Sequence, residues 1–339
     1  MKRMDDARMA ALAALLLDHS IRIRPGELFE INGGLAAKPL IKALLRGAAA
    51  RGAYPVVALE DDELTRLTLS CINPAHPERM RPALEKQAAW ELSKWEHVAA
   101  HIDIGVDEND AELAGVDGRA LACYREARAR VRQVMIDERR WVYLHYPTPA
   151  DAQKAGLCMD DMFALFFAAA QVDYAAMERD MMPLVRRMER ARRVRITGPG
   201  TDLTFSIEGM PVVPCAGRIN IPDGEVYTAP VRESVNGCIR YNTPARRYGH
   251  TFRNPCFEFE NGRIVRATCD GDAAGLNRLL DVDEGARYIG EFALGVNNAL
   301  RRAIGNALYD EKIGGSFHLT PGNAYRNAFN GNRSQLHLD

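Results

Sequence analysis

Hydrophobic and polar residues follow a helical period and a strand period in turn through the first part of the chain. Helical periodicity, in which apolar residues recur every three or four positions, covers residues 6–19, 36–51 and 160–193. The short apolar segments that we interpret as strands are residues 27–31, 55–59, 99–105 and 142–145. Alternation of this kind is typical of a largely parallel sheet covered by helices. We therefore expect an α/β domain over residues 1–190.

The pattern changes after residue 190, where glycine, proline and asparagine interrupt shorter apolar segments. The strands expected here are residues 203–207, 225–228, 237–241 and 257–267. Within the last segment, Asn261 and Gly262 separate two strand patterns, which is a strong signal for a two-residue hairpin turn. We therefore expect a β-rich α+β domain over residues 191–339, and we expect this second domain to carry the functional site.

The overall composition excludes several classes of protein. With 339 residues, a net charge of −1 and no strongly basic block, the chain lacks the charge pattern of a non-specific nucleic-acid-binding protein. The apolar segment at residues 9–17 is too short to cross a bilayer, so we expect no membrane partner. Seven scattered cysteines without a C-x-x-C pair are typical of reduced thiols in a cytoplasmic protein. A nucleotide cofactor is not expected, because Gly33 and Gly34 lack the G-x-G-x-x-G spacing.

The last quarter of the chain contains the clearest candidate chemistry. Glu291, His318, His337 and Asp339 lie in short apolar or alternating segments. In residues 335–339, two leucines alternate with His337 and Asp339, so a strand would place the imidazole and the carboxylate on the same face. Imidazole and carboxylate are ligands of divalent zinc, cobalt, manganese and iron. Singly, each residue is more often structural, but polar groups on an inward face need a partner, and a metal ion would satisfy them.

Several long motifs occur in a fixed order along the whole chain. They are residues 24–27, 146–156, 198–203, 220–230, 234–237, 290–291, 310–315 and 318–325. In these motifs the sequence resembles the M29 family of metallo-aminopeptidases, the aminopeptidase T group. The resemblance covers both expected domains, so it applies to the whole chain.

This resemblance implies a site with two divalent metal ions, which can be zinc, cobalt, manganese or magnesium. Matched motif by motif, the implied ligands are Glu225, Glu291, His318, His337 and Asp339. Tyr325 is the implied active-site hydroxyl, and Glu311 is a further acidic candidate for catalysis. The family also implies a homodimer that acts on short peptides.

The implied reaction is removal of N-terminal residues from short peptides by a water activated between the two ions. A glutamate, such as Glu291 or Glu311, would carry the proton to the leaving amine, and Tyr325 would hydrogen-bond the developing oxyanion. The sequence leaves open which glutamate bridges the ions, which metal is used and which N-terminal residue is preferred.

Two alternatives remain at this stage. His318, His337 and Asp339 also form the two-histidine, one-carboxylate set of a mononuclear Fe(II) enzyme, such as a ring-cleaving dihydroxypyridine dioxygenase. The second alternative is a non-catalytic protein that binds peptides or a metal. The sequence ends at Asp339, itself an implied ligand, whereas the resemblance implies further sequence beyond it, so we expect that the C-terminal end of the second domain is incomplete.

Overall fold

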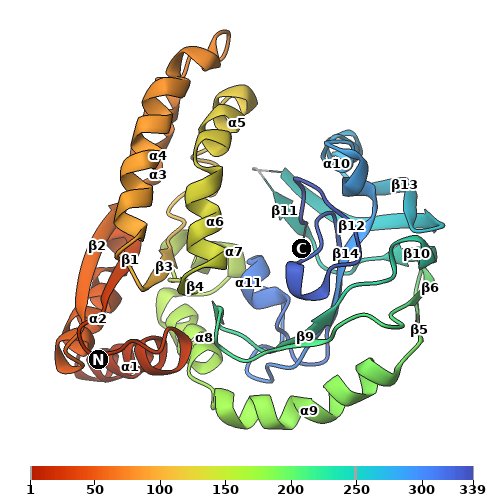
Figure 1. The fold of residues 1–339 in the computed structure, drawn as a ribbon. Coiled ribbons are helices and arrows are strands. Elements are labelled where there is room, and N and C mark those ends of the chain that lie inside the picture. The colour runs from red at the N-terminus through yellow and green to blue at the C-terminus, as the bar shows by residue number, and fades with distance from the viewer. Residues whose placement is uncertain (1, 248–249, 339) are drawn as a thin grey trace. The chain divides into compact units, whose positions relative to one another are not determined.

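The chain forms two compact units in a computed structural model that describes residues 2–247 and 250–338 (Figure 1). The first unit comprises Met1–Gln153, Leu157–Gln171 and Gly217–Ile221, and the second comprises Lys154–Gly156, Val172–Ala216 and Pro222–Asp339. Helix α9 (Tyr174–Arg190) lies before the boundary expected at residue 190, and this helix belongs to the second unit.

A five-stranded parallel sheet forms the centre of the first unit. Its strand order is β2 (Tyr54–Glu60), β1 (Leu28–Gly34), β3 (Ala100–Gly105), β4 (Arg140–His145) and β8 (Asn220–Ile221). The register places Ile31 of β1 beside Val57 of β2 and Ile102 of β3. Ile31, Ile102 and Val142 are fully buried, which explains why these strands are short apolar segments in the sequence. The expected parallel sheet is therefore present.

Helices surround this sheet in the order expected for an α/β unit. They are α1 (Lys2–Leu15), α2 (Lys38–Ala50), α3 (Asp62–Ser70), α4 (Arg81–Trp95), α5 (Gly118–Ala127), α6 (Ala129–Asp137), α7 (Pro149–Ala155) and α8 (Met159–Ala170). Helix α1 continues into a π-helical turn, Leu16–Ser20. Trp95 at the end of α4 is buried against Val131 and Val134 of α6, which joins these two helices side by side. Within the described residues, no helix is both long and apolar enough to span a bilayer.

The single helical segment expected at residues 160–193 is wrong, because the structure contains two helices there. Helix α8 ends at Ala170, and α9 begins at Tyr174. The side chain of Asp173 accepts a hydrogen bond from the backbone N–H of Ala176, so Asp173 caps the start of a new helix. Continuous helical periodicity does not reveal this interruption, because both helices present apolar residues at similar spacing.

The second unit contains two antiparallel sheets. The larger, six-stranded sheet contains β11 (Ala245–Arg247), β12 (His250–Glu260), β10 (Asn236–Arg240), β6 (Thr201–Ser206) and β5 (Arg193–Gly198) in this order, and β13 (Arg263–Asp270) pairs with β12. Strands β12 and β13 form the expected hairpin. Asn261 and Gly262 both have positive φ, 48° and 85°, which is the conformation of the favoured two-residue hairpin turn.

The smaller, four-stranded sheet carries the candidate site. Its order is β15 (Phe317–Pro321), β14 (Ile289–Gly295), β9 (Glu225–Thr228) and β7 (Val213–Cys215). One face is apolar, since Phe292 of β14 is buried with its ring 5.0 Å from the ring of Phe205 of β6. The remaining helices of this unit are α10 (Ala273–Leu280) and α11 (Ala307–Asp310). Because side chains alternate along each strand, Glu225, Glu291 and His318 lie on the other face.

Candidate metal centre

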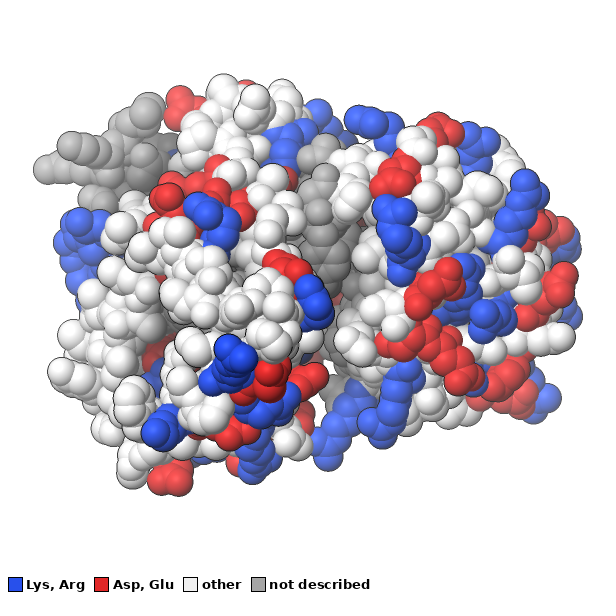
Figure 2. Space-filling view, turned by 90° about the horizontal axis from the view of Figure 1, so that it is seen from above, with Lys and Arg blue, Asp and Glu red and all other residues white. Residues whose placement is uncertain are grey.

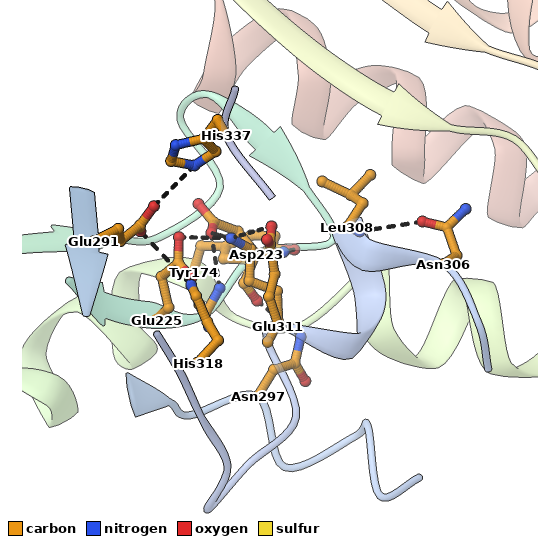
Figure 3. A network of polar contacts seen from close by, with 12 residues as sticks. Tyr174, Asp223, Glu225, Glu291, Asn297, Asn306, Leu308, Glu311, His318 and His337 are labelled. Atoms are coloured by element: carbon orange, nitrogen blue, oxygen red, sulfur yellow. Dashed lines mark hydrogen bonds and ion pairs between the residues drawn. The ribbon is translucent and has the colours of Figure 1, made fainter. Parts of the chain in front are cut away.

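Three neighbouring strands of the smaller sheet bring two glutamates and a histidine together (Figure 3). Glu225 is the first residue of β9, Glu291 lies on β14 and His318 lies on β15. The Nε2 atom of His318 lies 3.5 Å from Oε2 of Glu225 and 3.6 Å from Oε1 of Glu291. One potential ligand atom from each residue falls within 4.8 Å of the others. The strand register therefore assembles three of the residues expected from the sequence.

His337 joins this group from a segment outside the regular strands. Its Nε2 atom lies 3.2 Å from Oε2 of Glu291, so Glu291 lies between His318 and His337 (Figure 3). The Nδ1 atom of His337 lies 2.8 Å from the carbonyl oxygen of Asn323. Since a carbonyl oxygen can only accept, the Nδ1–H of His337 donates to it, and this contact orients the ring with its Nε2 toward Glu291.

In the described part of the segment expected as a strand at residues 335–339, His337 forms a single antiparallel bridge with Gly322. The expected alternation is nevertheless present, because Leu336 and Leu338 are buried while His337 contacts the polar face. Asp339, the fifth expected ligand, lies outside the described residues.

The two glutamates of the site are held in different electrostatic states. Both side chains are more than nine-tenths buried. Burial raises the pKa of Glu225, an effect that the nearby positive charges oppose only in part. Burial would also raise the pKa of Glu291, but hydrogen bonding and charge from His318 and His337 lower it below its usual value. Burial alone would lower the pKa of His318, but its contacts with Glu291 and Glu225 outweigh burial and raise this pKa well above its usual value. Glu291 is therefore held as a carboxylate between two imidazoles.

Lys312 is a buried cation that the sequence analysis did not single out. Its side chain is 1% exposed, and its Nζ lies 2.6 Å from Oε1 of Glu225 and 2.8 Å from Oε1 of Glu311. Asp223, also buried, lies 3.9 Å from the same Nζ. Burial by itself lowers the pKa of Lys312, but these carboxylates raise it well above its usual value. The only signal in the sequence was that Lys312 follows Glu311 in the 310–315 motif, and that signal does not separate a buried lysine from a solvated one.

The buried oxygens of the site fit a divalent cation. Oε2 of Glu225 is buried and has no hydrogen-bond partner among the described residues. A buried carboxylate oxygen without a partner is costly, and a cation between Glu225, Glu291 and His318 would remove that cost. Carboxylate oxygen and imidazole nitrogen are also the donor set that zinc, cobalt and manganese accept. These residues therefore have both the geometry and the chemistry of metal ligands.

Tyr325 and Glu311 lie at the border of this group. The ring of Tyr325 lies 4.6 Å from the ring of His337 and 5.7 Å from the ring of Tyr227, and Tyr325 is 44% exposed. Glu311 and His318 are among the residues that line a cavity of about 820 Å³ within the second unit. The structure therefore places the exposed phenol of Tyr325 next to His337, and it places Glu311 on the wall of the cavity that His318 also lines.

A second cluster of potential ligands, in the first unit, has a structural explanation. Asp107, His145 and Asp151 place one ligand atom each within 4.8 Å of the others. Asp151 accepts hydrogen bonds from the backbone N–H and the hydroxyl of Thr148, and its Oδ2 lies 2.8 Å from Nε2 of His145. Since Thr148 and Asp151 flank the start of α7, this is a helix cap that also holds a buried histidine.

Buried glutamates and histidines that converge beside an open cavity define a site of the kind used by metal-dependent hydrolases. Comparison with known protein families identifies the family to which the chain belongs. The model of the thermophilic metalloprotease (M29) family matches residues 5–339. The chain therefore belongs to the M29 metalloprotease family, as its motifs indicated.

Relatives in this family are similar over nearly their whole length. Aminopeptidase AmpS of Bacillus subtilis (strain 168) is 24% identical, with 95% of this chain and 85% of the relative covered. Aminopeptidase 2 of Geobacillus stearothermophilus is 27% identical, with coverage of 92% and 83%. The solved structure of wild-type AmpT from Thermus thermophilus superimposes with a TM-score of 0.84 at 24% identity, covering 98% of this chain and 92% of that one.

The family match confirms that the protein is a hydrolase of the metalloprotease class. The relatives' names favour aminopeptidase activity over the mononuclear dioxygenase that the sequence had left open. The structural match shows the fold, a parallel α/β region followed by antiparallel sheets.

Proposed function

We propose that this protein is a metal-dependent aminopeptidase that removes N-terminal residues from short peptides. The observation that carries this proposal is the convergence of Glu225 and Glu291 with His318 and His337 in one buried cluster. Two divalent ions, with zinc, cobalt, manganese and magnesium as the candidates, would be held by these four residues together with Asp339. When bound, such ions supply a Lewis acid for the scissile carbonyl and lower the pKa of a water nucleophile.

Cation binding and proton transfer fall to different glutamates of the chain. Glu291 is held as an anion between His318 and His337, so it is suited to bind cations rather than to carry a proton. Glu311 lies on the cavity wall, where it can accept a proton from water and return it to the leaving amine. We therefore assign the transfer of the proton to Glu311.

Tyr325 is positioned to stabilise charge that develops on the substrate. Its ring lies against that of His337, and nearly half of the residue is exposed. A phenol O–H in such a position can donate a hydrogen bond to the carbonyl oxygen as it becomes an oxyanion. This is the role expected for Tyr325 from the resemblance, and its location supports it.

Several finer expectations remain part of this proposal. We propose a cytoplasmic enzyme that acts as a homodimer on short peptides and does not bind nucleic acid. Figure 2 supports the last point for the face that it shows, where lysine and arginine residues are interspersed with aspartate and glutamate. Mixed charge of this kind lacks the basic patch that attracts a phosphate backbone.

The test combines metal analysis with two assays. Purified protein is depleted of metal with a chelator, reloaded with zinc, cobalt, manganese or magnesium, and assayed on aminoacyl p-nitroanilides and on short peptides. We expect hydrolysis that requires reloading, two ions per chain, and no cleavage of the same peptides after N-acetylation. One iron per chain with oxygen uptake on a dihydroxypyridine, and no peptide hydrolysis, would overturn the proposal.

A further inference from the structure

Glu225 contacts a different partner with each of its two carboxylate oxygens. Oε1 accepts a hydrogen bond from Nζ of Lys312 at 2.6 Å. Oε2 faces Nε2 of His318 at 3.5 Å and has no hydrogen-bond partner among the described residues. Because Lys312 occupies one oxygen, Glu225 presents a single oxygen to the group formed by Glu291 and His318.

Lys312 also lies among a second set of potential ligands in this unit. This set shares Glu225 with the set formed by Glu225, Glu291 and His318. Cys215, Asp223 and Glu225 each place one ligand atom within 4.8 Å of the others. The Nζ of Lys312 lies 2.6 Å from Glu225 and 3.9 Å from Asp223 in that set, and 2.8 Å from Glu311. A buried ammonium costs several kcal/mol in lost hydration unless carboxylates surround it, as they do here. The ammonium of Lys312 therefore already supplies a positive charge to the second set.

The backbone around Lys312 is fixed on both sides of its side chain. The carbonyl oxygen of Lys312 accepts from the N–H of Asn297, and the N–H of Lys312 donates to the carbonyl of Tyr309. The side-chain amide of Asn297 donates to the carbonyl of Asp223, and the N–H of Asp223 donates to the hydroxyl of Tyr174. Asn297 therefore joins the segment that carries Lys312 to the segment that carries Asp223. Asn297 and Asp223 are drawn in Figure 3.

We propose that Lys312 is a positioning residue of the metal centre. Its ammonium is a fixed cation that holds Oε1 of Glu225, leaves Oε2 as the single oxygen for a divalent ion, and prevents a divalent ion from binding among Cys215, Asp223 and Glu225. This inference rests on the proposed function, since it assigns Lys312 a role toward the cations that Glu225 would bind.

The test measures cobalt binding rather than activity alone. Lys312→Met removes the ammonium at similar side-chain volume, and Lys94→Met is the matched control, because Lys94 forms a 2.5 Å ion pair with Glu30 in the first unit. Cobalt(II) is titrated into metal-free protein while its visible absorption is recorded. We expect the Lys312→Met protein to show shifted absorption bands and about 10–100-fold weaker binding, with kcat lowered to a similar extent and KM within about threefold. Lys94→Met should match wild type.

A double variant separates positioning from simple charge balance. Lys312→Met with Glu311→Gln removes one positive and one negative charge, so it should recover the thermal stability of the metal-free protein but not the wild-type cobalt spectrum. Recovery of both would overturn the positioning role, as would a wild-type spectrum in Lys312→Met. If Lys312→Met does not fold, Lys312→Arg keeps the charge but moves it, and a wild-type spectrum in that variant overturns the inference. Failure of wild type to bind cobalt would instead overturn the metal centre itself.

Discussion

The carboxylate of Glu291 lies 3.2 Å from the imidazole of His337, although Glu291 belongs to a central strand and His337 to a segment that makes only one bridge. This contact joins His337 to the other site residues, because the second carboxylate oxygen of Glu291 lies 3.6 Å from His318. The position of one carboxylate therefore determines whether the two imidazoles face a common point.

Glu291→Gln is the most direct test of this arrangement. Glutamine has the same shape but cannot supply the anion that lies between His318 and His337, so metal affinity and peptide hydrolysis should each fall by at least about 100-fold. Metal content by elemental analysis and circular dichroism on the same sample check this result. Glu260→Gln, at an exposed position of β12, is the matched control. Full activity in Glu291→Gln would remove Glu291 from the site.

Tyr325→Phe should affect catalysis and leave stability nearly unchanged. Tyr325 is 44% exposed, so it contributes little to the core, but its ring lies against that of His337. Loss of one oxyanion donor lowers kcat by about 100–1,000-fold in other enzymes, and we expect a decrease of that order here. Steady-state kinetics and thermal unfolding measure the two effects. Tyr54→Phe, at a residue 72% exposed in the first unit, should change neither.

Removal of metal should destabilise the second unit. Without a cation, Oε2 of Glu225 is buried and lacks a donor among the described residues. A metal that binds only the folded state adds about 2.7 kcal/mol at a free concentration 100 times its Kd. We therefore expect the melting temperature to fall on chelation and to rise again with metal concentration, as measured by calorimetry. A melting temperature that does not respond to either treatment contradicts a metal site at Glu225.

The Glu27–Arg140 ion pair predicts a dependence on pH in the first unit. Burial acts to raise the pKa of Glu27, but the hydrogen bonds from Arg140 and from the N–H of Arg24 lower it below the model-peptide value of 4.5. A carboxyl with a lowered folded-state pKa stabilises the protein above its unfolded pKa, and this stabilisation is lost as the pH falls through the lowered value.

Glu27→Gln should therefore reduce the free energy of unfolding by about 0.5–1 kcal/mol at neutral pH. The difference between variant and wild type should shrink toward zero at an acidic pH below the lowered pKa of Glu27. Urea unfolding at both pH values measures it. A difference that stays constant over this range would show that the pair does not titrate with folding.

The hairpin turn at Gly262 should tolerate alanine worse than Gly271 does. Both glycines have positive φ, 85° and 97°. A Cβ at Gly262 would lie 2.0 Å from the carbonyl oxygen of Arg232, whereas a Cβ at Gly271 meets nothing within 4 Å. Gly271→Ala should cost about 1 kcal/mol for the backbone conformation alone, and Gly262→Ala should cost clearly more. Urea unfolding of both variants compares them, and equal costs would contradict the steric argument.

Local sequence patterns were sufficient for much of the fold. Four apolar segments of the first unit became parallel strands, and in the inner strands β1, β3 and β4 burial of residues such as Ile31, Ile102 and Val142 explains the apolar pattern. The turn at Asn261 and Gly262 formed where expected, because few residue pairs accept two consecutive positive φ values. Such features depend on neighbours in the sequence, so the sequence alone reveals them.

Features that depend on distant neighbours were not predictable in this way. Strand β8 lies after residue 190 but pairs in parallel with β4 of the first unit, through Tyr143 beside Asn220 and Leu144 beside Ile221. The break between α8 and α9 depends on one cap at Asp173. Neither feature changes the hydrophobic periodicity along the chain, and this periodicity was the signal from which the helices and strands were predicted.

The sequence by itself determined which residue types were present for the chemistry. Its ordered motifs identified the metalloprotease family and named Glu225, Glu291, His318 and His337 as candidates before any distances were known. Tertiary structure alone decided that these residues meet, that Glu291 lies between two imidazoles, and that Lys312 is a buried cation. The physical reason is that burial and charge pairing arise from strand register and packing between segments far apart in the chain, whereas periodicity and motifs record only what is adjacent along it.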